Sequence, residues 1–185
     1  DTHAAIDELR RQVPELRAVT LIGLRLGATI AAAAAATRAD VDRLVLWDPV
    51  TDGADYMQAF LRLNLMAQMA VHKKVVEDRE QLVARLARGE SVNVEGFALK
   101  QELFAQVSGI RLLALQPSAA TRSLLVSISA RESPAPASLT ELANAWPDAT
   151  VGSAIEEPFW RELRRFYGRA KNLERTTFEW LGAAS

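Results

Sequence analysis

A strand, an alanine-rich helix and a second strand follow one another near the start of the chain, and this order constrains the fold most. Residues 18–22 form a short apolar run rich in β-branched side chains, which predicts a strand buried on both faces. Residues 28–37 predict a helix, and residues 41–47 predict the second strand. Two strands joined by one crossover helix are parallel. The sequence therefore predicts an α/β protein with a mostly parallel sheet flanked by helices.

The rest of the chain predicts a helical block and then a return to the sheet. Apolar residues recur at helical spacing through residues 52–108, which indicates an insertion. Residues 122–129 form the best strand pattern of the second half. Residues 149–155 predict a last strand, and residues 159–181 predict one or two terminal helices.

The length of the chain, 185 residues, suits one domain with a substantial core. We expect residues 1–50 to form the first part of a core sheet, residues 51–110 a helical cap insertion, and residues 111–185 the second part of the core with the C-terminal helices. The chain begins with Asp1 and not with Met, which indicates a fragment or a processed form.

The turn between the first strand and its helix carries Gly23 and Gly27, with Arg25 midway between them. In the nucleophile elbow, G-x-S-x-G, the flanking glycines keep Cβ atoms out of a crowded, strained turn. The spacing of Gly23 and Gly27 fits that pattern, although simple packing of the helix on the strand also explains it. A dinucleotide-binding fingerprint is excluded, because that motif needs glycine where Arg25 stands.

Over most of its length the chain resembles α/β-hydrolases, specifically the group near the exosortase-associated and serine-aminopeptidase-like hydrolases. The matching segments are residues 23–29, 46–50, 60–63, 96–99 and 157–160. The resemblance implies an α/β-hydrolase fold with a helical cap. It also implies that further strands and one oxyanion-donor loop precede Asp1, so that the chain is N-terminally truncated.

The chain departs from the hydrolase pattern at two catalytic positions. The chain order of that pattern is serine, acid, histidine. Arg25 occupies the serine position, and no histidine follows the last predicted strand. The candidate acids are Asp48 and Glu132. We therefore expect a pseudo-hydrolase with a degenerate triad that serves as a ligand-binding or accessory protein beside polysaccharide-export or exosortase functions.

The sequence leaves two alternatives open. One is an active acyl hydrolase, esterase- or peptidase-like, that uses non-standard residues. A serine other than the elbow residue would then need an adjacent base, and His72 on a predicted cap helix is a weak candidate. The other is a structural partner domain, which a closed cavity filled with aromatic side chains would favour.

Arg25 is expected at the positive end of a helix dipole, where a cation needs an anionic partner. An internal pair with Asp48 or Glu132 is one partner, and a ligand carboxylate or phosphate is the other. Trp160 would close the pocket. A small anionic or acyl ligand would contact Gly23, Leu24, Arg25, Leu26, Gly27, Asp48 and Trp160.

The expected cap contains three methionines, Met57, Met66 and Met69, at helical spacing. A stripe of this kind predicts a face buried against the sheet. Lys73 and Lys74 follow it, and we expect them on a solvated face.

Composition excludes several other functions. Lys+Arg is 22 and Asp+Glu is 23, so the charge of −1 gives no basic excess for nucleic acid. Cysteine is absent, and we expect no metal and no cofactor. The longest apolar stretch is too short to span a membrane, and a cytoplasmic location is expected. The first strand, residues 19–22, exposes an edge if upstream strands are missing, which favours self-association.

Overall fold

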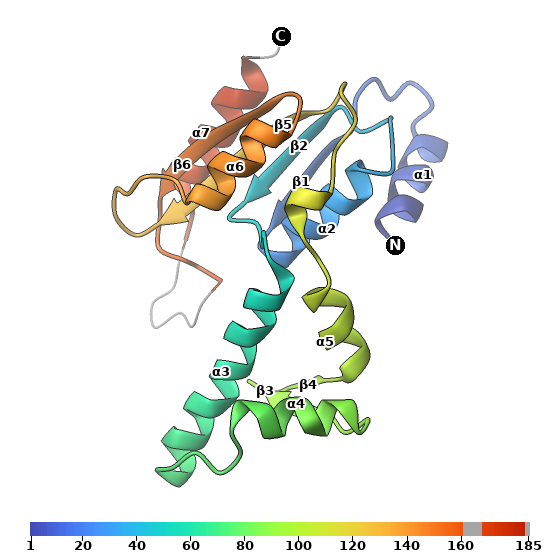
Figure 1. Ribbon diagram of the computed structural model, residues 1–185. Coiled ribbons are helices and arrows are strands. Elements are labelled where there is room, and N and C mark those ends of the chain that lie inside the picture. Colours follow the sequence, from blue (N-terminus) through green and yellow to red (C-terminus); the bar gives the residue numbers. More distant parts are fainter. Residues whose placement is uncertain (161–167, 184–185) are drawn as a thin grey trace. The chain divides into compact units, whose positions relative to one another are not determined.

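The strands of the first structural unit form one parallel sheet, as the βαβ pattern predicted (Figure 1). The computed structural model describes residues 1–160 and 168–183. Unit 1 comprises residues 1–51 and 112–185, and unit 2 comprises residues 52–111. The strands of unit 1 stand in the order β1-β2-β5-β6. They are β1 (Thr20–Leu24), β2 (Arg43–Trp47), β5 (Arg122–Ser129) and β6 (Ala149–Ile155).

Helices cover both faces of this sheet, which is why its strands read as continuous apolar runs. The helices of unit 1 are α1 (Thr2–Gln12), α2 (Leu26–Ala35), α6 (Ala137–Ala145) and α7 (Lys171–Gly182), with a short 3₁₀ helix at Leu112–Ala114. Figure 1 shows α6 in front of the sheet and α7 behind it. Leu44 and Leu46 point to the face of α2 and α6, whereas Val45 points to the face of α7.

The alanines of α2 bring this helix close to the sheet. Ala28, Ala32 and Ala35 are fully buried in the core that also contains Leu44 and Leu46. Small side chains let a helix backbone approach the strands, so the alanine run is a packing surface. The opposite face packs on Leu173 of α7 with several aromatic side chains at its margin.

A small ion network ties α1 to the segment after α2. Arg10 Nε lies 2.8 Å from Asp40 Oδ2, and Arg38 Nε lies 2.7 Å from Asp40 Oδ1. The same guanidinium also contacts α1, since Arg38 Nη1 lies 2.7 Å from Asp7 Oδ1. The Arg38 guanidinium, helped by Arg10, holds the pKa of Asp40 well below its usual range. This network therefore favours the folded state while Asp40 is ionised.

Unit 2 is mainly helical, with one small hairpin. It contains α3 (Gly53–His72), α4 (Arg79–Ala87), β3 (Val92–Val94), β4 (Phe97–Leu99) and α5 (Gln101–Ser108). Its ends meet where Arg111 Nε approaches Asp52 Oδ2 at 3.1 Å. Gly53 is required there, because a Cβ atom would lie 1.7 Å from the Val107 carbonyl oxygen.

Two expectations on local structure are corrected by the structure, and a third falls partly outside the described residues. Leu99, expected on a helix with Leu103 and Val107, instead ends β4, because Glu95 and Gly96 both adopt positive φ and form the two-residue turn of the β3–β4 hairpin. The strand expected at residues 18–22 instead spans Thr20–Leu24. The C-terminal helix begins at Lys171, and residues 161–167 of the predicted 159–181 helix lie outside the described residues.

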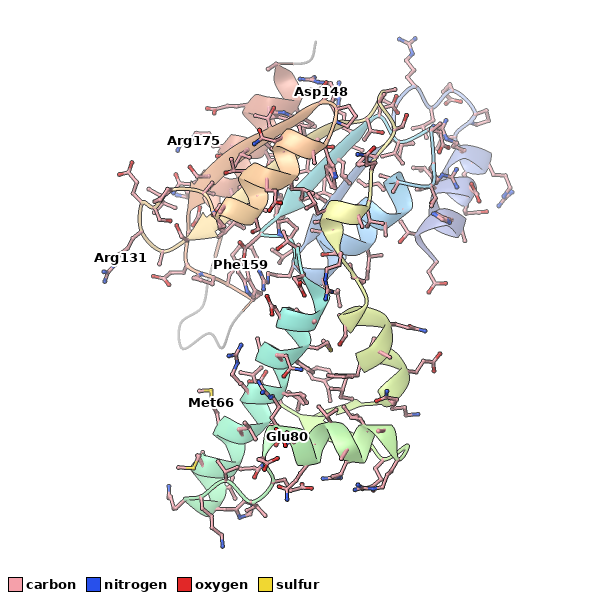
Figure 2. The ribbon with its side chains drawn as sticks, viewed as in Figure 1. Met66, Glu80, Arg131, Asp148, Phe159 and Arg175 are labelled. Atoms are coloured by element: carbon pink, nitrogen blue, oxygen red, sulfur yellow. The ribbon has the colours of Figure 1, made fainter. Side chains whose placement is uncertain are left out.

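The buried stripe expected for the methionines of α3 holds for Met57 only. Met57 is buried, whereas Met66 and Met69 are 66 % and 48 % exposed. Figure 2 shows Met66 on the side of α3 away from α4 and α5. The expectation of one buried methionine stripe is therefore wrong, because Met66 lies nine residues after Met57 and so on the opposite side of the helix.

Candidate functional site

The turn after β1 has a strained backbone centred on Arg25. Its φ of 53° and ψ of −123° belong to a region that residues other than glycine rarely adopt. The Arg25 N–H still pairs with the Trp47 carbonyl at 2.9 Å, so the β1–β2 ladder extends to the turn. The next residue already begins α2. The chain thus reverses from strand to helix within one residue, as it does in a nucleophile elbow.

The two glycines beside Arg25 have different roles. A Cβ atom on Gly23 would lie 2.5 Å from the backbone of Ala28 and from the Gly27 carbonyl oxygen, so only glycine fits there. A Cβ atom on Gly27 would meet nothing within 4 Å. The expectation that both glycines relieve crowding is therefore wrong for Gly27, because α2 turns that position outward.

Arg25 and Asp48 form the central ion pair of this turn. Asp48 follows β2 and has a φ of 44°, and its N–H donates to the Val126 carbonyl of β5 at 2.7 Å. Arg25 Nη1 donates to Asp48 Oδ2 at 2.6 Å and to the Asp48 carbonyl oxygen at 2.9 Å. The two side chains are 30 % and 22 % exposed. The internal pair expected from the sequence is thus confirmed, with Asp48 as the partner.

This ion pair offsets the unfavourable position of a cation at the start of a helix. The positive end of the α2 dipole would disfavour a charged side chain at the helix start by about 0.3–1 kcal/mol. A charge-assisted contact at 2.6 Å to a partly buried carboxylate acts in the opposite direction. Arg25 is therefore held by Asp48 against the local field of the helix.

Trp160 lies against the guanidinium of Arg25. The Arg25 Cζ atom is 5.4 Å from the centroid of the Trp160 ring, within the range of a cation–π contact. Phe159 meets Trp160 edge to face, with ring centroids 5.4 Å apart. In the margin of the α7-side core, these rings join the residues after β6 to the residues after β1 and β2. Figure 2 labels Phe159 in this region.

Thr29 fixes the segment that carries Asp48, a role that the sequence did not reveal. Its Oγ1 donates to the Val50 carbonyl at 2.8 Å, and its side chain is fully buried. The signal available in the sequence was a single polar residue, Thr29, at the start of the alanine-rich helix. The bond holds residues 48–50 beside the helix start.

The other candidate acid, Glu132, is separate from this pair. It lies in the exposed loop after β5. Ser129, at the end of β5, donates its hydroxyl to the Arg131 carbonyl at 2.5 Å and lies 3.1 Å from the Ser133 hydroxyl. These contacts are between neutral groups, and none supplies the base that an activated serine needs.

A carboxylate that the sequence reasoning missed, Glu156, follows the last strand. Its side chain is buried, and its Oε1 accepts the Asn172 N–H at the start of α7 at 2.6 Å. Its own N–H donates to the Ser129 carbonyl at 2.9 Å. The available signal was an acidic residue between a strand and a helix N-terminus. Its contacts with α7 give it a structural role.

Both histidines of the chain precede residue 73. His3 Nε2 lies 3.1 Å from the hydroxyl of Thr37, which follows the C-terminal end of α2. Arg25 stands at the other end of this ten-residue helix, about 15 Å away along the axis. His72 ends α3 in unit 2 and is exposed. Within residues 1–160 and 168–183, no cluster of three metal-ligating side chains occurs.

Comparison with known proteins identifies the fold. No family model and no curated protein sequence matches this chain. The structure of Est1E from Butyrivibrio proteoclasticus with bound ferulic acid aligns with a TM-score of 0.56 and 15 % identity. A thermostable carboxyl esterase from Bacillus coagulans, in complex with glycerol, aligns with a TM-score of 0.50 and 13 % identity. The chain has the α/β-hydrolase fold.

The aligned regions cover different shares of these proteins. The match to Est1E covers 82 % of this chain and 55 % of Est1E, and the match to the carboxyl esterase covers 98 % and 68 %. The chain thus spans little more than half the length of Est1E. In the α/β-hydrolase fold a nucleophile sits on a strained strand-to-helix turn at the end of the sheet. The Arg25 turn has this arrangement.

Proposed function

We propose that this chain is a non-catalytic α/β-hydrolase-fold protein, in which Arg25 stands where a hydrolase carries its serine. The observation that carries the proposal is the Arg25–Asp48 pair on an elbow-like backbone. A guanidinium stays protonated at physiological pH and offers no lone pair for attack on a carbonyl. The group at the elbow can therefore bind an anion but cannot form an acyl intermediate.

The distribution of histidines supports the same proposal. The chain order of the fold's triad places histidine last, after the acid. No histidine follows His72 in this sequence, and the residues after β6 are Glu156 and Glu157. The rival function, an active acyl hydrolase with non-standard residues, needs a base beside Ser129 or Ser133. The contacts of Ser129 favour a structural role for both hydroxyls.

The class of ligand follows from what Arg25 already binds. Its guanidinium donates twice to Asp48, once to a carboxylate oxygen, and Trp160 covers one face. A small ligand carboxylate, such as an acyl acid, would take the place of the Asp48 carboxylate on the same donors. The site would comprise Gly23, Leu24, Leu26 and Gly27 with these three residues. Without a bound ligand, the Arg25–Asp48 contact would occupy the site. The chain would then act as an accessory protein.

Three further expectations from the sequence are also proposals. These are membership of the exosortase-associated group, a cytoplasmic location and a cap role of unit 2. Self-association is a fourth, supported by the place of β1 at the edge of the described sheet. In the described residues, no helix is long and apolar enough to cross a membrane.

Labelling of the full-length protein with a fluorophosphonate tests the proposal, because this probe reacts with activated serines. Intact-mass measurement should show no adduct on protein that is folded by circular dichroism, while an active serine esterase in the same tube is labelled completely. A single stoichiometric adduct would overturn the proposal. Peptide mapping and the variants Ser129→Ala and Ser133→Ala would then identify the nucleophile.

A further inference from the structure

The corner between α3 and α4 exposes several apolar side chains. We define the α3–α4 corner as residues 66–76, the last two turns of α3 and the loop after it. Met66 is 66 % exposed and Val71 is 73 % exposed. The exposed large apolar side chains of this corner are Met66, Met69, Val71, Val75 and Val76. Single exposed apolar residues are ordinary, but a group within eleven residues indicates a contact surface.

Hydrogen bonds from Gln68 hold the loop of this corner in place. Gln68 Oε1 accepts the N–H groups of Val76 at 2.6 Å and of Glu77 at 2.9 Å. Its Nε2 donates to the Glu77 carbonyl at 3.0 Å and to Asn64 Oδ1 at 2.7 Å. The same side chain thus ties the loop to the helix on both sides. The exposure of Val75 and Val76 is therefore a feature of an ordered loop.

The helix ends in a left-handed residue that carries the first of two lysines. Lys73 has a φ of 59°, and its N–H donates to the Met69 carbonyl at 3.1 Å. This termination places Lys73 and Lys74 directly between the exposed residues of α3 and the exposed valines of the loop. Both lysines are exposed, and Lys73 Nζ donates to the Ala70 carbonyl at 3.0 Å. The two lysines are therefore flanked in the sequence by exposed apolar residues on both sides.

The charged side chains of residues 66–76 are both lysines, although acidic residues follow at positions 77 and 78. Residues 66–76 contain Lys73 and Lys74 and neither Asp nor Glu. Glu77 pairs with Arg85 at 2.8 Å. Asp78 accepts the Gln81 N–H at 2.9 Å and caps α4. Glu77 and Asp78 thus make contacts with α4, and residues 66–76 by themselves carry two lysine charges and no carboxylate.

We propose that the α3–α4 corner binds the surface of an anionic lipid bilayer. Apolar side chains beside lysines match a bilayer interface, in which the apolar groups enter the acyl boundary and the ammonium groups meet phosphates. The two lysines of residues 66–76 favour an anionic lipid surface over a second copy of this chain, whose residues 66–76 carry the same two positive charges. The interaction is peripheral and does not depend on the function proposed for the Arg25 site.

Flotation of the full-length protein with vesicles tests this proposal. The protein should bind phosphatidylcholine vesicles that contain about 30 % phosphatidylserine, and binding should weaken at high salt. The double variant Lys73→Gln/Lys74→Gln should reduce binding about tenfold or more. The double variant Val71→Ser/Val75→Ser should reduce binding to a similar extent. Each altered side chain is exposed, so the fold should persist.

Matched controls use exposed residues elsewhere in unit 2. Phe97→Ser, at a side chain 71 % exposed on β4, and Lys100→Gln, before α5, should leave vesicle binding unchanged. No binding to anionic vesicles would overturn the proposal. It would also be overturned by equal loss in the control variants. If instead the corner variants dissociate an oligomer and vesicles do not bind, the corner contacts a second copy and the lipid proposal is wrong.

Discussion

Arg25 Nη1 donates to both the carboxylate and the carbonyl oxygen of Asp48, at 2.6 Å and 2.9 Å. The two residues follow adjacent parallel strands, and Leu24 and Trp47 are register partners at the ends of those strands. The Arg25 side chain therefore joins the segments that follow β1 and β2 at the carboxyl end of the sheet.

The glycine pair provides a contrast at the elbow. Gly23→Ala should lower the free energy of unfolding by about 3 kcal/mol or more, because the new Cβ meets backbone atoms that cannot move away. Gly27→Ala should be neutral or stabilising by about 0.5 kcal/mol, because the position is helical and open. Urea denaturation measures both. Equal destabilisation by the two substitutions would show that the turn is not built as described.

The pH dependence of stability should report the Asp40 network. The pKa of Asp40 is lowered in the folded state from an ordinary value of 3.8, so protonation opposes folding. Its contribution is fully present above about pH 4 and is lost as the pH falls toward the folded-state pKa. Asp40→Asn should therefore lower the melting temperature by roughly 2 °C at pH 7, and the difference should shrink below pH 4.

A matched acid elsewhere serves as the control for that experiment. Asp148 lies 3.5 Å from Arg122 and is more exposed than Asp40. Asp148→Asn should have a smaller effect at pH 7. A difference for Asp40→Asn that persists unchanged at pH 2.5 would contradict the assignment.

The edge strand β1 should control self-association. Among the described strands β1 pairs with β2 alone, and Ile22 on it is 49 % exposed. A charged side chain on an edge strand opposes pairing with another chain. Ile22→Lys should reduce any concentration-dependent association seen by sedimentation velocity. Ile30→Lys, an equally exposed position on α2, should not. A wild-type protein that is monomeric at all concentrations would contradict the expectation.

Much of unit 1 could be predicted from the sequence because its signals are local. Two apolar strands joined by one crossover helix must be parallel, and β1, α2 and β2 follow one another in this order. That pairing also brings Arg25 and Asp48 together, since adjacent parallel strands end at the same edge. The contact between Arg25 and Trp160 could not be predicted, because it joins residues 135 positions apart whose approach depends on tertiary packing.

In unit 2 the sequence pattern did not predict which residues of α3 are buried, nor the hairpin. Met57 and Leu61 are four residues apart and share the buried face of α3. Met66 lies on the opposite side of the helix from Met57 and is exposed, so the three methionines do not form the single buried stripe that the sequence suggested. The sequence predicts a short extended segment at residues 92–94, which is β3, but not its pairing with β4, because each strand has only three residues.

A double-mutant cycle on Arg25 and Asp48 tests the central claim most directly. The variants Arg25→Ala, Asp48→Ala and the double variant are compared with the wild type by urea denaturation at pH 7. The account predicts a coupling free energy of about 1–2 kcal/mol, because either single substitution removes the partly buried contact between the guanidinium and the carboxylate. The hydrogen bond to the Asp48 carbonyl survives in Asp48→Ala and does not enter the coupling. Strictly additive effects of the two substitutions would mean that Asp48 does not hold Arg25, and would contradict the account.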